Sequence, residues 1–268
     1  MLTIKPYQEN FSFKANLNSP RLRLNQKDFF IKIRGYGRNS DWAKQIVKTT
    51  DVAVNMIRNN SSAENVLKLI TRGVCAANRY PYDIEKRVKT GILRTHRENW
   101  SSVHTKNREV YTPYKKGRYN CYSERLDNVC NSPLLPISNE IGMSRPNNKQ
   151  EIQHGKSQLI NKSLDYIFSL FKNKFSVFID KDVKNTDLTE IINIVAEIRW
   201  VLAHATPWLR GSDAISNVFM RAMLKAVGVK AYPPAKNISY DLEAYCRNID
   251  DYKKNFNSFF EKPLEVIE

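Results

Sequence analysis

Two segments in the second half of the chain repeat apolar residues at three- and four-residue intervals, the spacing of one buried helix face. The first segment starts near Asp187, ends near His204 and is about five turns long. The second starts after Gly211 and ends before Gly228. The apolar positions are Leu188, Ile191, Ile192, Val195, Ile198 and Leu202 in the first, and Ile215, Val218, Phe219, Ala222, Met223 and Ala226 in the second. The pattern predicts two buried helices joined by a short loop.

The loop between these helices holds residue types that suit an anion. Pro207 disfavours helical geometry in Thr206 and so ends the first helix, and Gly211 permits a tight turn. Ser212 is predicted as the N-cap of the second helix. The free N–H groups at the helix start and the guanidinium of Arg210 favour a phosphate or diphosphate. In the alternative interpretation, Arg210 pairs with a carboxylate and Ser212 is only a cap.

Helical spacing also appears elsewhere in the chain. Residues 42–57 and 63–74 predict two helices, with Asn60-Ser61-Ser62 as the turn and cap between them. A further helix is expected over residues 83–103. The last helix is expected from Ser239 or Asp241 to about Phe260, with Asp241 either a cap or a pocket residue.

Turn signals interrupt the helical pattern over residues 120–155, which contain several Pro and Asn residues. Short strands are expected at 134–137 or 175–179. We therefore predict a mainly α domain over residues 31–268, with a smaller α/β or loop-rich lobe inserted at about 115–160. The lobe is expected to lie over the pocket and select the acceptor; the alternative is a disordered linker.

The fold expected for this domain comes from a resemblance. From about Thr186 to Phe260, the chain resembles the AvrB avirulence family of bacterial type III effectors, which share the Fido fold with Fic and Doc proteins. The motifs that carry the resemblance are Arg199-Trp200, Pro207, Arg210-Gly211-Ser212-Asp213-Ala214, Gly228-Val229, Pro233-Pro234 and Asp241-Leu242-Glu243-Ala244.

The resemblance implies an effector that transfers a deoxysugar such as rhamnose from a nucleotide-sugar to a Ser or Thr hydroxyl of a host protein. The implied donor is a UDP- or dTDP-deoxysugar. Arg210, with Gly211 and Ser212, would hold the diphosphate, and Asp241 would orient the acceptor or sugar hydroxyl. Thr112-Pro113 resembles a Thr-Pro segment near the family pocket, so Thr112 is expected to bind substrate.

The chain departs from the Fic signature, which places a carboxylate between its histidine and arginine to support a phosphate-bound metal. No carboxylate stands between His204 and Arg210, so no metal requirement is expected. His204 is a hypothetical general base, because the unperturbed imidazole pKa of roughly 6.5 suits proton removal. Its alternative role is that of a hydrogen-bonded histidine at a helix end. His154 is predicted to lie in a polar surface loop.

Two alternative functions remain. The first is a Fic-type nucleotidyltransferase (AMPylator) that modifies a host protein, and the second is a non-catalytic effector that binds host protein. A type III effector would be secreted into the host cytoplasm. Residues 1–30, rich in Asn from Tyr7 onwards, are expected to be flexible, as a secretion signal or a frayed end. No transmembrane segment is expected, and Leu2 excludes N-myristoylation, which needs glycine.

The net charge of +16 raises the question of nucleic-acid binding. Basic residues are interleaved with aromatic ones between Arg79 and Arg125. In nucleic-acid-binding proteins, such residues bind phosphate backbones and stack on bases. No nucleic-acid motif accompanies them, so a solvated basic face, or one that attracts an acidic host partner or anionic lipid, is favoured instead. The four cysteines have no metal-ligand spacing. Free thiols are expected in a cytosol, although Cys121 and Cys130 are near enough in sequence to pair.

Overall fold

The structure is a computed structural model that describes residues 19–34, 36–78, 90–97 and 110–267. It is mainly helical with small antiparallel sheets, as predicted. The helices are α1 (Ser40–Arg58), α2 (Ala63–Ala77), α4 (Ser123–Asn131), α5 (Ile160–Leu170), α6 (Leu188–Ala205), α7 (Ser212–Ala226), α8 (Tyr240–Tyr245) and α9 (Ile249–Asn255). The strands are β1 (Tyr111–Pro113), β2 (Arg145–Pro146), β3 (Glu151–Gln153), β4 (Val229–Lys230) and β5 (Glu265–Val266).

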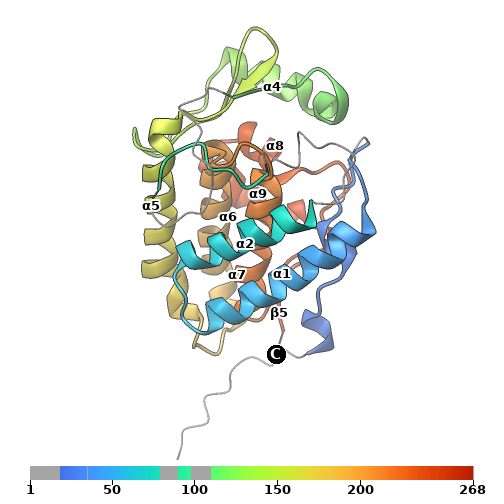
Figure 1. The fold of residues 1–268 in the computed structure, drawn as a ribbon, viewed down its shortest axis with the longest axis vertical. Coiled ribbons are helices and arrows are strands. Elements are labelled where there is room, and N and C mark those ends of the chain that lie inside the picture. The colour runs from blue at the N-terminus through green and yellow to red at the C-terminus, as the bar shows by residue number, and fades with distance from the viewer. Residues whose placement is uncertain (1–18, 35, 79–89, 98–109, 268) are drawn as a thin grey trace, which may run out of the picture.

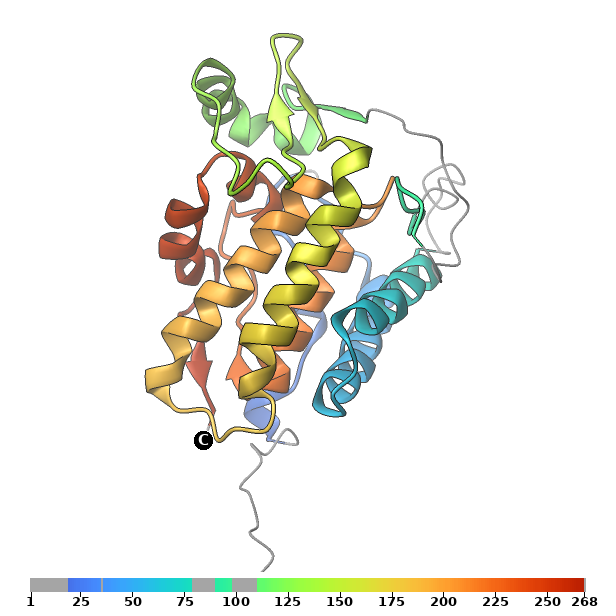
Figure 2. The same ribbon diagram turned by 90° about the vertical axis from the view of Figure 1, so that its left-hand side faces the viewer.

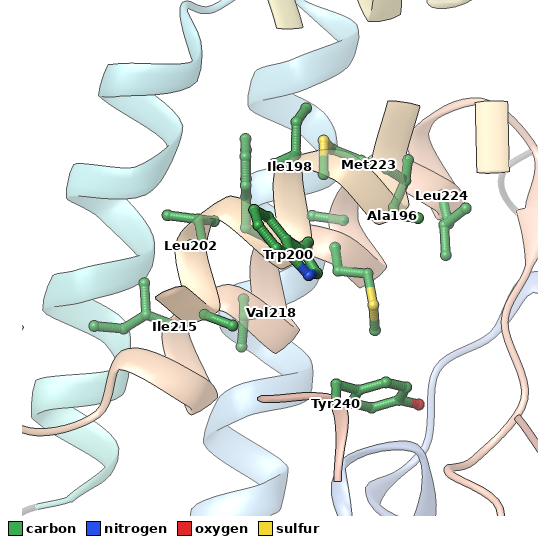
Figure 3. Packing of buried hydrophobic residues seen from close by; sticks show 14 of the residues in the cluster. Ala196, Ile198, Trp200, Leu202, Ile215, Val218, Met223, Leu224 and Tyr240 are labelled. Carbon is green, nitrogen blue, oxygen red and sulfur yellow. The ribbon is translucent and has the colours of Figure 1, made fainter. Parts of the chain in front are cut away.

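Helix α6 lies at the centre of the bundle and contacts α5, α7, α8 and α9. Its second half is buried on all sides: apolar residues cover most of its circumference, and Arg199 and His204 are buried with them. Trp200 is completely buried among Ile198 and Leu202 of α6, and the neighbouring α7 contributes Ile215 and Val218 (Figure 3). The two helices predicted from periodicity are thus confirmed, and together they form the core that supports the loop between them.

Helices α1 and α2 form a hairpin that packs against α7 (Figures 1 and 2). Asn39 caps α1 by accepting a hydrogen bond from Trp42 N, and Ser62 caps α2 in the same way through Asn65 N. Asn60 turns the chain between them with a positive φ of 58°. Both helices and the turn were predicted from the sequence and are confirmed.

Residues 111–153 contribute a three-stranded antiparallel sheet of order β1-β3-β2, which lies with α4 at one end of the bundle (Figure 1). Thr112 pairs with Ile152 in the register of β1 and β3. The prediction of a strand at 134–137 or 175–179 is wrong. The first segment is irregular, and the second continues α5 as π and 3₁₀ turns because Phe175 and Phe178, three residues apart, both face the core.

Three further expectations need correction. The expected helix over 83–103 is absent from residues 90–97, which instead run beside the 206–211 loop; 83–89 and 98–103 lie outside the described residues. The single C-terminal helix is broken into α8 and α9, because Asn248 caps α9 anew. Residues 19–30 are packed rather than flexible, with Leu22 and Phe29 in the core; 1–18 lie outside the described residues.

The remaining expectations concern the membrane and the thiols. In the described part of the chain, no helix is long and apolar enough to cross a membrane. The four cysteines are free thiols, and Cys121 and Cys130 do not form a disulfide.

Candidate functional site

A cavity of about 590 Å³ lies where the end of α6, the start of α7 and the small sheet meet the segment before α1. This volume is in the range of small-molecule sites in proteins. Arg210, Gly211, Ser212, Asp241 and Thr112 all line the cavity. Five of the six site residues predicted from the sequence are therefore brought together, although they come from three separate parts of the chain.

The loop at the cavity wall is held in shape by two left-handed residues. Thr206, before Pro207, has φ 43° and ends α6, and Gly211 has φ 87° immediately before α7. Glycine suits the second position because a side chain at such a φ is strained. Leu209 N donates to Ile92 O at 2.9 Å, so the 90–97 segment supports the loop from outside.

The start of α7 differs from the prediction in one respect. Gly211, not Ser212, occupies the N-cap position, and no side chain in the described part of the chain caps the helix. The Ser212 hydroxyl instead donates to Trp208 O at 2.9 Å and accepts from Trp208 N at 3.1 Å. Among the described residues, the first-turn N–H groups of α7 therefore have no side-chain acceptor, and they lie beside the exposed Arg210. This is the arrangement that favours an anion.

Asp241 is fixed by the residues that start α8. Its Oδ1 accepts hydrogen bonds from Ser239 Oγ at 2.6 Å and from Leu242 N at 2.9 Å. The Tyr36 hydroxyl lies 3.1 Å from the same Ser239 Oγ and also lines the cavity. Both hydrogen bonds of the Asp241 carboxylate within the described residues thus go to one oxygen, which orients the group.

Thr112 contacts His154, a histidine that was not predicted as a site residue. Its Oγ1 lies 2.8 Å from His154 Nε2, and both residues line the cavity. His154 Nδ1 lies 3.1 Å from Thr206 Oγ1 and 3.3 Å from Ser144 Oγ. The sequence prediction of a surface loop for His154 is wrong, because strand β3, which ends at Gln153, carries the residue into the cavity.

The hydrogen bonds assign the tautomer of His154. Thr206 Oγ1 donates its proton to Ala203 O at 2.8 Å, and Ser144 Oγ donates to His204 O at 2.7 Å. Each hydroxyl has one proton, so both accept from Nδ1, and Nε2 is left to accept from the Thr112 hydroxyl. Burial, followed by the charge of Arg94, lowers the pKa of His154 to about 3. The ring is therefore neutral near pH 7.

His204, the predicted general base, does not line the cavity. Its side chain is completely buried, 4.1 Å from the Trp200 ring and 5.5 Å from the Tyr245 ring between centroids. Nε2 donates to Ala244 O at 3.0 Å. Burial lowers the pKa of His204 to about 4. Of the two interpretations from the sequence, this environment fits the hydrogen-bonded histidine at a helix end, and Tyr245 lines the cavity in its place.

A buried ion pair forms part of the cavity wall. Arg199 Nη2 contacts Asp213 Oδ1, and the Arg199 side chain is completely buried. Burial, followed by the neighbouring Asp241, raises the pKa of Asp213 to about 7, and Arg199 opposes this change. The titratable side chains of the wall thus include Arg118, Arg199 and Arg210 against the two carboxylates, an excess of positive charge.

Glycine and arginine hold the small sheet close to the end of α6. A Cβ on Gly155 would lie 2.7 Å from His204 O, so only glycine permits this approach. The buried Arg94 joins the same parts: its Nη2 donates to Gly155 O at 2.6 Å and its Nη1 to Thr206 O at 2.9 Å. A cation at a helix C-terminus also offsets the dipole of α6.

The described residues contain no group of three or more His, Cys, Asp or Glu that could hold a metal ion. A comparison with curated proteins finds no match. A comparison with protein families finds one for residues 136–263, which match the family of avirulence proteins AvrB_AvrC. The matched region contains His154, Arg210 and Asp241, whereas Thr112 precedes it.

Proposed function

Because residues 136–263 belong to the AvrB/AvrC family of avirulence proteins, we propose that the protein is an effector that glycosylates a host protein. The donor is a UDP- or dTDP-deoxysugar such as rhamnose, and the acceptor is a Ser or Thr hydroxyl. One observation carries this proposal: Arg210, the uncapped start of α7 and Asp241 line one cavity of a size that suits a nucleotide-sugar.

The diphosphate binds at the start of α7. Arg210 provides a planar pair of donors, and the first-turn N–H groups of α7 add donors that carry partial positive charge. In the transfer, the bond between the sugar anomeric carbon and the diphosphate oxygen breaks, and the diphosphate leaves with the electron pair. Arg210 and α7 stabilise the negative charge that develops there, which is where electrostatic catalysis is most effective.

Asp241 receives the proton of the attacking hydroxyl as the new glycosidic bond forms. Its carboxylate is held by Ser239 and Leu242 through Oδ1, so it is oriented before substrate binds. Burial lowers the pKa of His154 to about 3, so its Nε2 is a poor proton acceptor near pH 7. A role in orienting a hydroxyl, as it now orients that of Thr112, suits His154 better.

Ligand-induced stabilisation tests the proposal. At 100 times Kd, a ligand stabilises the folded chain by about 2.7 kcal/mol, which raises Tm by roughly 5–10 °C for a protein of this size. We expect UDP- or dTDP-rhamnose to give such a shift in wild type and none in Arg210→Ala. Arg72→Ala is the matched control, since Arg72 is an exposed arginine on α2 outside the cavity.

A contrasting variant separates binding from transfer. Asp241→Asn should keep the Tm shift and lose donor turnover by about 100-fold or more, the usual effect of removing a general base. Turnover is measured as nucleoside diphosphate released in the presence of Ser- and Thr-containing peptides. A shift produced by ATP alone would favour nucleotidyl transfer instead, and no shift with any nucleotide would leave a binding effector without this chemistry.

A further inference from the structure

The inner wall of the cavity is formed by one face each of two neighbouring helices. Arg199 and Ala203 are four residues apart on α6, and Asp213 and Asn217 are four residues apart on α7. Residues with this spacing share a helix face. All four line the cavity, and α6 contacts α7 along this wall.

Two polar side chains of this wall have atoms without a hydrogen-bond partner among the described residues. Arg199 is completely buried, and among the described residues only its Nη2 is paired, whereas Nε and Nη1 have no hydrogen-bond partner. Asn217 is 7% exposed, and its Oδ1 likewise has no partner within the described chain. An unsatisfied buried polar group costs about 1–3 kcal/mol. Folding alone does not explain why polar side chains occupy these positions.

The chemistry of the two groups selects the ligand. A guanidinium only donates hydrogen bonds, and the Asn217 amide presents an acceptor at one end and a donor at the other, whichever way it is turned. A hydroxyl satisfies both, because it accepts from Arg199 and donates to Asn217. A second phosphate suits the wall less, because it cannot donate to Oδ1 and would face Asp213 and Asp241.

We propose that Arg199 and Asn217 form a subsite for adjacent hydroxyls of a sugar ring in the nucleotide-sugar donor, an inference that rests on the proposed function. The ring is either the ribose of the nucleotide or the sugar that is transferred. In both cases, the subsite recognises a neutral diol while Arg210 and the start of α7 hold the diphosphate. Asp213 and the Tyr240 ring hold the Arg199 guanidinium in place to bind the hydroxyls. The Tyr240 ring centroid lies 5.9 Å from Arg199 Cζ.

Asn217→Leu tests the subsite because leucine has a similar volume and no polar atoms. Calorimetric titration with UDP-rhamnose should show affinity at least 10-fold weaker than wild type. Tm of the free protein should be unchanged or higher, because Asn217 Oδ1 has no partner among the described residues to lose. Asn161→Leu is the control for affinity: Asn161 Oδ1 also lacks a partner among the described residues, and Asn161 lies outside the cavity. Because its Nδ2 donates to His96 O at 2.8 Å, this variant should lower Tm without weakening binding.

Two further probes identify the ring. If the subsite binds the transferred sugar, UDP alone binds Asn217→Leu as tightly as wild type. If it binds the ribose, the affinity of Asn217→Leu for UDP falls as much as its affinity for UDP-rhamnose. Its affinity for dTDP, which lacks the 2′-hydroxyl, falls less. Arg199→Lys provides a second variant that keeps the charge beside Asp213 but loses the guanidinium donors, and it should weaken the same probes.

The possible failures are distinguishable. If Arg210→Ala abolishes binding of UDP-rhamnose while Asn217→Leu and Arg199→Lys bind it like wild type, the subsite is refuted and the diphosphate site stands. If wild type binds neither UDP-rhamnose nor dTDP-rhamnose, the proposed function and the subsite fall together.

Discussion

Asp213 is a carboxyl group on which opposing influences act. It lies in the first turn of α7, where the helix dipole favours its charge, and it pairs with Arg199. Burial and Asp241 nevertheless raise its pKa from 3.8 to about 7. The folded chain therefore binds a proton at Asp213 at pH values where the unfolded chain has already released it.

This difference makes stability depend on pH. Because the folded-state pKa is the higher one, the stabilisation from Asp213 is complete below about pH 4 and is lost as pH rises to about 7. The amide side chain in the variant Asp213→Asn cannot titrate. The Tm of wild type should therefore fall more between pH 4 and pH 8 than the Tm of the variant. Melting curves of both proteins across this range measure the effect. Parallel pH profiles would show that Asp213 ionises normally.

At the scale of elements, the break between α8 and α9 depends on a single cap. Asn248 Oδ1 accepts from Asp251 N at 2.8 Å and so starts α9. Asn248→Ala should destabilise the protein by about 1 kcal/mol, the usual cost of losing an N-cap. Urea unfolding measures this, and Asn248→Asp, which keeps the acceptor, should stay near wild type. An unchanged midpoint for the alanine variant would mean that α9 is held by its packing alone.

Periodicity was sufficient to predict elements whose apolar face is continuous. It located α1, α2, α6 and α7 within a few residues, because each buries one regular stripe or, for α6, the whole surface of its second half. It failed for α8 and α9, where the apolar spacing continues across the break and the cap at Asn248 decides the boundary. It also failed at 175–179, since a β-prone composition does not exclude a helical turn that buries the same phenylalanines.

The candidate site was predictable only where its residues share a local motif. Arg210 and Gly211 follow from the loop between two patterned helices, and Asp241 follows from the family resemblance. His154 was missed because its place depends on the pairing of β1 with β3, which connects residues 42 positions apart and leaves no local pattern. Asn217 lies among the buried residues of α7, and only the cavity distinguishes it from core.

At the scale of the whole molecule, one carboxylate attaches the small lobe to the bundle. Glu243 on α8 is buried and accepts from Arg125 Nη1 and Nη2 at 2.7 and 2.8 Å. It also accepts from the Tyr122 hydroxyl at 2.7 Å and from Arg247 Nε at 2.8 Å. Tyr122 and Arg125 belong to η3 (Gly117–Tyr122) and α4, so these contacts join the two parts that contribute to the cavity.

Removing this charge should loosen the lobe before it unfolds the bundle. Glu243→Gln is expected to cost about 2 kcal/mol, less than the 3–5 kcal/mol for fully buried pairs, because Arg125 is partly exposed. Hydrogen exchange should accelerate in residues 117–131 and stay slow in α6. Equal acceleration in both regions would show instead that the lobe and the bundle unfold as one unit.

The absence of a side chain at Gly155 has a consequence for how the protein can vary. The backbones of Gly142, Gly155 and His204 meet so closely that a single methyl group at position 155 would have to push the sheet away from α6. His154 precedes Gly155 and is hydrogen-bonded to Thr112, so both residues would shift relative to Arg210. Mutation can therefore reshape the cavity from a position that contributes no chemical group to it. Among natural variants of this protein, exchanges of Gly155 should be as rare as exchanges of Arg210 itself.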